Sequence, residues 1–446
     1  MTRTEDLRGP LSDDTGAAPP PRVARSVGHS LLGTTGTRVL GALGGLLAAR
    51  LLGPSLRGEY AVAFTVATIS GMVATCGVQF WVVVAIGRRD DVGVVARTVR
   101  RHLAAMLVAH VLLAAAAVLW RPGGVSAWTV VGVAAFSFLS AAGMLLMAAP
   151  LAVRDLRTVA VGSAAGGATF AAGLVVLVVL DRPSVALVMI AAALGSAVTA
   201  VAGARRFHSL TSAIAARVSP VRTSARSWRP AIREFAGAGF GEVVLLGMLR
   251  IDFLLLAALL PIRDVGLYAV ASSVTELLWV VPDAAAQVAL PLSTEERDGR
   301  PVTRLFRLAL LATALAGVAL ALLAPVAIPI VFGASYRHAA AAVPLLCVAA
   351  VAAGGWKILA AEAATRGDPS ARLMSATTGL LAMVICDLIA VPPLGIVGAS
   401  LGAAVGYSAA AMAMGARWAR LPGADLGELW RFRRADLPPL PRRAGS

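Results

Sequence analysis

Long apolar runs separated by short polar breaks decide what this chain can fold into. Most of them have the roughly 20 residues that a helix needs to cross about 30 Å of hydrocarbon at 1.5 Å per residue. An open strand would leave backbone amides unpaired in lipid, so each run is expected to be a helix. With 58% hydrophobic and 14% charged residues, the chain cannot be a soluble multidomain enzyme. The runs are 29–52, 58–87, 103–120, 126–152, 158–180, 184–203, 234–260, 266–292, 303–323, 339–365, 371–391 and 396–416.

The basic residues are distributed unevenly over the breaks between these runs. If the N-terminus lies inside, 31 of the 40 basic residues fall on the inner side and 5 on the outer side. Such a bias sets the orientation of membrane helices, so we predict a multi-pass protein of the cytoplasmic membrane with both termini cytoplasmic. Because the charge follows membrane topology, the net charge of +16 does not indicate a nucleic-acid partner.

A short internal repeat divides the chain into two halves. Leu51-Leu52 followed by Gly58-Glu59-Tyr60-Ala61-Val62-Ala63 matches Leu259-Leu260 followed by Gly266-Leu267-Tyr268-Ala269-Val270-Ala271, always 208 positions apart. An even number of helices per half makes such repeats parallel. We therefore predict an all-α integral membrane protein of about 12 transmembrane helices in two six-helix lobes related by a parallel repeat. The expected parts are a disordered tail (1–28), a first lobe (29–203), a basic linker (204–233), a second lobe (234–416) and a basic tail (417–446).

Ionisable residues within the runs are costly, so they are candidate functional residues. Arg38 lies near the middle of the first run, and no acidic residue lies deep in the first six runs. A lone arginine at this depth is expected to face water or an anionic ligand. The other candidates lie in the second half: Arg250 and Lys357 for an anionic substrate, and Asp252, Glu276 and Asp283 for a coupling cation.

Intra-lobe ion pairs are the alternative explanation for the charges of the second half. Arg250 and Glu276 each lie ten residues in from the outer face of adjacent helices, so they can pair. Arg250 and Asp252 cannot share a face, because two residues turn a helix by about 200°. One of them is expected to face a central cavity and the other its own lobe.

Several further residues are expected to have structural roles. Arg50 and Asp387 lie near the outer surface, where their side chains can extend to water. His110 is expected to be a satisfied polar residue in the middle of its helix. In the first run, small residues at intervals of four favour close packing within a lobe over a moving seam: Gly33, Thr37, Gly41 and Gly45.

Motifs of soluble catalytic sites are missing from the sequence. Lys357 is followed by Ile358, so it does not belong to a phosphate-binding loop of an ATPase. There is no HExxH motif, and the three cysteines are scattered through apolar runs. We therefore expect no catalytic residues, no metal site and no cofactor, and we expect that the chain is not an enzyme.

Parts of the chain resemble a known family of transporters. Ala48-Ala49-Arg50-Leu51-Leu52-Gly53-Pro54 with Gly58-Glu59-Tyr60 resembles the start of the polysaccharide/oligosaccharide (O-antigen-type) flippases. Arg250-Ile251-Asp252 with Gly266-Leu267-Tyr268-Ala269-Val270-Ala271 resembles the opening of their second lobe. Gln287, Pro291, Phe332-Gly333 and Tyr336 resemble later signatures, and the resemblance covers roughly 29–415. These flippases belong to the multidrug/oligosaccharidyl-lipid/polysaccharide exporter superfamily.

The resemblance implies two lobes around a central cavity and alternating access for polyprenyl-diphosphate-linked glycans. Its implied partners are this glycan lipid, membrane lipid, and a cell-surface polysaccharide polymerase or glycosyltransferases. Arginine or lysine at the cavity would bind the diphosphate by charge-assisted hydrogen bonds. Three alternatives remain open: a peptidoglycan lipid-precursor flippase, a cation-coupled multidrug antiporter on the same fold, and a non-transporting assembly protein.

Overall fold

The computed structural model describes the backbone of residues 21–88, 91–120, 125–217, 228–295, 300–366, 368, 370–421, 424 and 426–431. It describes most of their side chains from residue 41 onward. No strand occurs within these ranges. The protein is therefore an all-α membrane protein, as predicted. Nine of the described helices are long and apolar enough to cross a membrane, or ten with one bent pair, so the count of twelve stays a prediction.

The first half begins with an unusually long helical segment. α1 (Pro21–Thr75) contains the first predicted run and most of the second, joined by a kink at Gly53, where φ is 68° and Pro54 follows. Beyond Cys76 and Gly77, α2 (Val78–Gly87) continues the second run at an angle of 46°. The next four runs form α3 (Val92–Trp120), α4 (Ala127–Ala152), α5 (Leu156–Val179) and α6 (Val185–Arg217).

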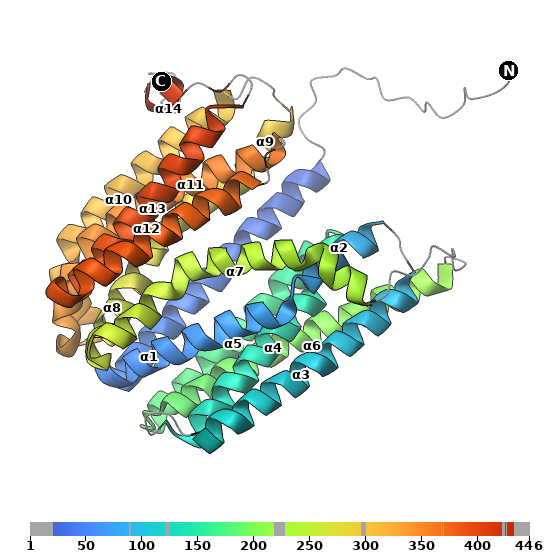
Figure 1. The fold of residues 1–446 in the computed structure, drawn as a ribbon, viewed down its shortest axis with the longest axis horizontal. Helices are drawn as coiled ribbons and strands as arrows, with labels where there is room; N and C mark the ends of the chain where they lie inside the picture. Colours follow the sequence, from blue (N-terminus) through green and yellow to red (C-terminus); the bar gives the residue numbers. More distant parts are fainter. Residues whose placement is uncertain are drawn as a thin grey trace, which may run out of the picture.

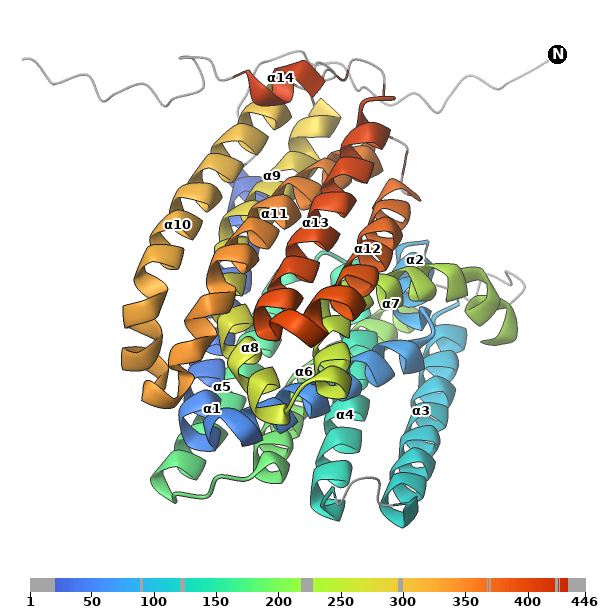
Figure 2. The same cartoon turned by 60° about the vertical axis from the view of Figure 1, so that its left-hand side comes forward.

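The second half has a matching order of helices with additional breaks. Its eighth run is divided into α8 (Ile262–Thr275), the 3-10 helix η2 (Glu276–Trp279) and α9 (Val280–Glu295). The other elements are α7 (Trp228–Leu259), α10 (Arg300–Phe332), η3 (Ala334–Ala342), α11 (Val343–Thr365), α12 (Ser370–Leu394), α13 (Ile396–Trp418) and the short α14 (Leu426–Trp430). Figures 1 and 2 show α3–α6 grouped on one side and α10–α13 on the other, with α1, α7 and α8 between them.

The two copies of the sequence repeat meet each other where the halves touch. A Cβ atom on Gly58 would clash with the Ile262 carbonyl oxygen, and one on Gly266 would clash with the Pro54 carbonyl oxygen. Gly266 lies 208 residues after Gly58, and Ile262 lies 208 residues after Pro54, so the two contacts are equivalent in the repeat and the contact is itself two-fold. Glycine allows two helix backbones to approach this closely. The repeated glycine is therefore a contact between the halves, which the sequence pattern alone does not reveal.

Hydrogen bonds join the halves near the same contact. Arg50 Nε and Nη2 donate to the carbonyl oxygens of Val331 and Ile330, at 2.6 and 3.0 Å. These carbonyls end α10, where helices leave oxygen atoms without intrahelical partners. Tyr336 Oη donates to the Ala49 carbonyl oxygen at 2.8 Å. Arg50 is exposed as expected, but its guanidinium also ties the first half to the second.

A second structural repeat lies at the other end of the helices. Asp155 caps α5 by accepting from the Thr158 amide, and it pairs with Arg206 of α6 at 2.7 Å. Asp368 accepts from the Ala371 amide at the start of α12, and it pairs with Arg417 of α13 at 2.8 Å. In each half, the last two long helices (α5 and α6, α12 and α13) are thus connected by an ion pair between an aspartate that caps the first helix and an arginine of the second. This agreement supports the proposed duplication of six helices.

These two caps predict how the stability of the protein changes with pH. Desolvation raises the pKa of Asp155, but hydrogen bonds from Thr158 and Arg206 outweigh it and hold the pKa below its usual value. Hydrogen bonds from Ser370 and Arg417 likewise lower the pKa of Asp368. A lowered pKa stabilises the fold above the carboxyl's usual pKa, and this contribution is lost as the pH falls through the folded-state value.

We expect Asp155→Asn and Asp368→Asn to lower the Tm of the solubilised protein at neutral pH. The difference from the wild type should shrink as the pH falls through the pKa values of these carboxyl groups. Asp181→Asn is the control, because Asp181 is exposed at a turn of the predicted outer side. A Tm difference that is the same at neutral and acidic pH would contradict the pairing.

Candidate functional site

A cavity of about 620 Å³ lies between the two halves. Its wall comes from α1, α4, α5 and α6 of the first half and from α7, α8, η2 and α9 of the second. This volume is within the range of about 300–1,000 Å³ that is typical of small-molecule sites. Only three charged residues line the cavity within the described part of the chain: Arg57, Arg250 and Glu276.

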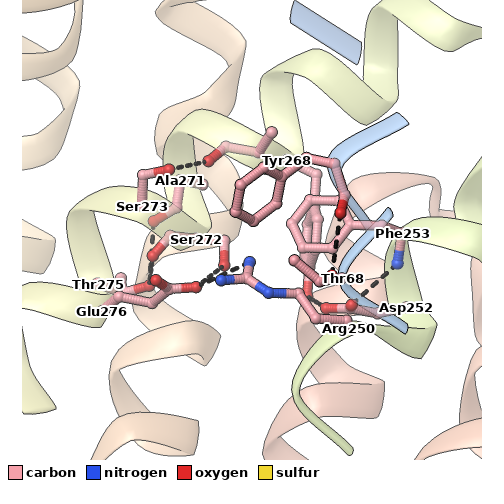
Figure 3. Close-up of polar contacts among 12 residues, drawn as sticks. Thr68, Arg250, Asp252, Phe253, Tyr268, Ala271, Ser272, Ser273, Thr275 and Glu276 are labelled. Atoms are coloured by element: carbon pink, nitrogen blue, oxygen red, sulfur yellow. Dashed lines mark hydrogen bonds and ion pairs between the residues drawn. The ribbon is translucent and has the colours of Figure 1, made fainter. Parts of the chain in front are cut away.

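Arg250 and Glu276 form the ion pair that their positions in adjacent helices predict. Arg250 Nη1 lies 3.3 Å from Glu276 Oε1, and Figure 3 shows the guanidinium directed at this carboxylate. The same guanidinium lies 5.8 Å from the ring centroids of both Phe64 and Phe253. Arg250 is thus both a cavity residue and one member of an intra-lobe pair.

Arg57 is the cavity residue that sequence analysis missed. It counted among the outer basic residues, yet it is only 7% exposed and lines the cavity. Its Nη2 donates to Ser273 Oγ at 3.3 Å, and its guanidinium carbon lies 5.2 Å from the Tyr60 ring centroid. Its Nε has no hydrogen-bond partner within the described part of the chain. Pro54 was the available signal, because proline favours the first turn of a helix and so places Arg57 inside the second helix.

Asp252 faces away from the cavity, into its own lobe; the 200° turn predicts that only one of Arg250 and Asp252 faces the cavity, but not which one. It is 6% exposed, and it accepts hydrogen bonds from Tyr268 Oη at 2.6 Å and the Phe253 amide at 2.9 Å. Asp252 therefore cannot bind the same ligand atoms as Arg250.

Asp387 was expected to extend to the outer surface, and this prediction was wrong. The residue is 0% exposed, and neither carboxylate oxygen has a hydrogen-bond partner among the described residues. The carboxylate packs against Gly402 of α13, where a Cβ atom would clash with it. Asp387 lies close enough to Asp252 and Tyr268 to interact with both electrostatically. The error arose because distance along a helix does not show whether a neighbouring helix covers the side chain.

The remaining candidates lie in different environments. Lys357 Nζ is 3.0 Å from Asp283 Oδ1 and 4.0 Å from the Trp279 ring centroid, so it forms an ion pair within the second lobe. Neither Lys357 nor Asp283 is among the residues that line the cavity. Arg38 belongs to α1, but its side chain lies outside the described part, so its role stays a prediction. His110 is a satisfied polar residue as expected, bonded to the Met106 carbonyl at 2.7 Å and Ser137 Oγ at 2.8 Å.

The overall fold is that of known membrane transporters. Neither a protein-family model nor a curated protein sequence matches the chain. Among solved structures, it is similar to the lipid II flippase MurJ in an inward closed conformation, with a TM-score of 0.68 and 13% identity over 89% of this chain and 88% of that one. It is also similar to an inward-facing multidrug resistance MATE family transporter of the MOP superfamily, with a TM-score of 0.60 and 17% identity over 84% and 92%.

A third solved structure has the same fold. A point mutant of the Vibrio cholerae MATE transporter VcmN matches with a TM-score of 0.58 and 14% identity over 89% of this chain and 95% of that one. Identities this low establish the fold alone. The chain is thus a multi-pass membrane protein with the MurJ and MATE transporter fold.

Proposed function

We propose that the protein is a transporter of the multidrug/oligosaccharidyl-lipid/polysaccharide exporter superfamily. It flips polyprenyl-diphosphate-linked oligosaccharide across the cytoplasmic membrane by alternating access, for cell-surface polysaccharide biosynthesis. The observation that carries the proposal is the placement of Arg57 and Arg250 on the wall of a cavity between the halves. Arginine buried inside a membrane protein is costly and marks substrate pathways, and its planar fork suits phosphate oxygens.

Arg57 and Arg250 would bind the diphosphate in different ways. Arg57 Nε has no partner within the described residues, so it can donate to a phosphate oxygen without breaking an existing bond. Arg250 shares its charge with Glu276 at 3.3 Å, so a diphosphate would compete with that carboxylate for it. If the diphosphate replaced the Glu276 carboxylate as the partner of Arg250, substrate binding would be linked to a structural change at η2, which carries Glu276. The lipid tail would remain in the bilayer beside the lobes.

Two buried carboxylates of the second lobe are suited to a coupling cation. Asp387 is fully buried with both oxygens unpartnered among the described residues, and Asp252 is near enough to interact with it. A buried carboxylate without a partner is strongly destabilising unless a proton or metal cation neutralises it. Cation uptake at these two groups would therefore change the packing of α7 against α12 and α13. We retain Glu276 and Asp283 as weaker candidates, because each forms an ion pair.

We expect Asp387→Asn to remove the dependence of flipping on an ion gradient. The amide keeps the shape of the side chain but removes the charge that a cation would neutralise. The measurement is flipping of fluorescent polyprenyl-diphosphate glycan in proteoliposomes with imposed sodium or proton gradients. Glu242→Gln is the matched control, since Glu242 lies 3.6 Å from Arg372 near the predicted cytoplasmic end. Unchanged gradient dependence in Asp387→Asn would rule out this site.

A multidrug cation antiporter is the second candidate function, because Glu276 contributes a carboxylate to the cavity. Its charge is already balanced by Arg250, and the net charge of the three ionisable lining residues is positive, which disfavours a cationic substrate. The deciding experiment compares three substrates in wild-type proteoliposomes: polyprenyl-diphosphate glycan, the peptide-bearing peptidoglycan precursor and a lipophilic cation. Transport of the cation alone would overturn the proposed function.

A further inference from the structure

Three neighbouring glycines of α1, at positions 41, 44 and 45, are of two structurally different kinds. Gly44 is buried, and a Cβ atom there would lie 2.8 Å from Phe170 Cε1, so Gly44 serves close packing against α5. A Cβ atom on Gly41 or Gly45 would meet no atom within 4 Å in the described part of the chain, and both residues line the cavity. Sequence analysis assigned Gly41 and Gly45 to helix packing. Instead, no described residue packs against either position, and both border the cavity.

The part of the cavity wall that comes from α5 and α6 carries no charged residue. Apart from Phe170, the lining residues from α5 and α6 are small or carry hydroxyl groups: Ser163, Gly166, Gly167, Ala192, Gly195, Ser196 and Thr199. The Ser163 and Ser196 hydroxyls form no hydrogen bond with another described residue, so they are available to a ligand. None of the three charged lining residues comes from α5 or α6: Arg57 belongs to the part of α1 beyond its kink, Arg250 to α7 and Glu276 to η2.

The separation of charged from uncharged lining residues indicates which chemical group of a bound headgroup would lie at each part of the cavity. Arg57 is more than nine-tenths buried, and its Nε has no partner among the described residues, so it indicates where an anion binds. Hydroxyl groups without charge, together with aromatic rings such as Phe170 and Phe136, suit sugar hydroxyls and the apolar faces of sugar rings. Carboxylates or amines of a peptide would be desolvated there without an ionic partner, which is unfavourable.

We infer that Gly41 and Gly45 are specificity-determining residues, which keep space on the uncharged wall for the neutral sugars that follow the diphosphate. The inference rests on the proposed function, and it deepens it by naming neutral sugar as the substrate class. Glycine in a helix interior stabilises less than alanine. If these glycines had only a structural role, adding a side chain that meets no atom would leave the fold intact and transport unchanged.

The first experiment measures flipping by Gly41→Leu and Gly45→Leu in proteoliposomes. The two substrates are polyprenyl diphosphate carrying one sugar and the same lipid carrying several neutral sugars. We expect the loss to be about tenfold larger for the longer glycan, with an unchanged Tm, because the added side chain removes pocket volume. Gly87→Leu is the matched control, since a Cβ at the exposed Gly87 also meets no atom within 4 Å and Gly87 does not line the cavity. Equal flipping of both lipids by Gly45→Leu and the wild type would overturn the inference.

A binding experiment separates this inference from the proposed function. Gly45→Cys in an otherwise cysteine-free protein is labelled with a water-soluble thiol reagent, with and without a short-chain prenyl-diphosphate disaccharide. We expect this glycan to slow labelling about tenfold, whereas inorganic diphosphate or a lipophilic cation leaves the rate unchanged. Protection with no flipping by the wild type would refute transport but keep the sugar site. No protection by the glycan, or protection by the cation, would overturn the sugar site.

Discussion

Replacing Arg57 with alanine should strongly reduce flipping of polyprenyl-diphosphate glycan while leaving folded protein in the membrane. Arg57 forms no ion pair among the described residues, so its removal does not leave a buried carboxylate without its partner. Each charge-assisted hydrogen bond to a phosphate is worth about 1.5–3 kcal/mol, so loss of one should lower the flipping rate about 10- to 100-fold. Arg57→Lys should recover only part of this activity, because lysine keeps the charge but loses the planar fork.

The controls for this prediction distinguish substrate binding from folding. Arg263→Ala removes a basic residue of the same predicted side that is exposed and does not line the cavity, so it should flip as the wild type does. Arg250→Ala should also lose activity, but it leaves Glu276 unpaired, so it is measured together with Arg250→Ala/Glu276→Ala. The flipping assay is accompanied by expression level and Tm. Wild-type flipping by Arg57→Ala would end the proposal that Arg57 contacts the headgroup.

Adding a side chain at the glycine contact between the halves should trap the transporter with its predicted outer side open. A Cβ atom at Gly58 or Gly266 would clash with the backbone carbonyl of Ile262 or Pro54, and a backbone atom cannot rotate away. Each lobe can still fold, because the clash is with the other half. We expect Gly58→Val or Gly266→Val to lower flipping at least about tenfold, since alternating access requires this contact to close in each cycle.

Accessibility of the cavity provides the readout for this trap. Ser273 lines the cavity beside Arg57, so Ser273→Cys in a cysteine-free background reports entry of an impermeant thiol reagent from outside. Labelling should become faster when Gly58→Val is added. Gly143→Ala is the control, because a Cβ there makes only ordinary contacts at 3.7 Å or more. If Gly58→Val lost activity without faster labelling from outside, the glycine pair would not be a gate.

Interactions between adjacent helices could be predicted from the sequence. The helix repeat places Arg250 and Glu276 at equal depth on neighbouring helices, and the structure confirms their pair at 3.3 Å. The same periodicity predicts that Asp252 faces the opposite direction, and it does. These features depend on spacing along one helix or across one turn, so the local geometry of the chain is sufficient to predict them.

The sequence by itself determined the membrane location, the all-helical fold and the position of the repeat, because apolar length and period are local properties of the chain. Tertiary structure decided what each buried position contacts. It placed Arg57 in the cavity rather than in a loop, and it covered Asp387 with Gly402 of the next helix. It also gave two adjacent glycines different surroundings: Gly44 packs against Phe170, whereas Gly45 borders open space. Adjacent glycines look alike in a sequence, because the atoms that distinguish them belong to helices more than a hundred residues away.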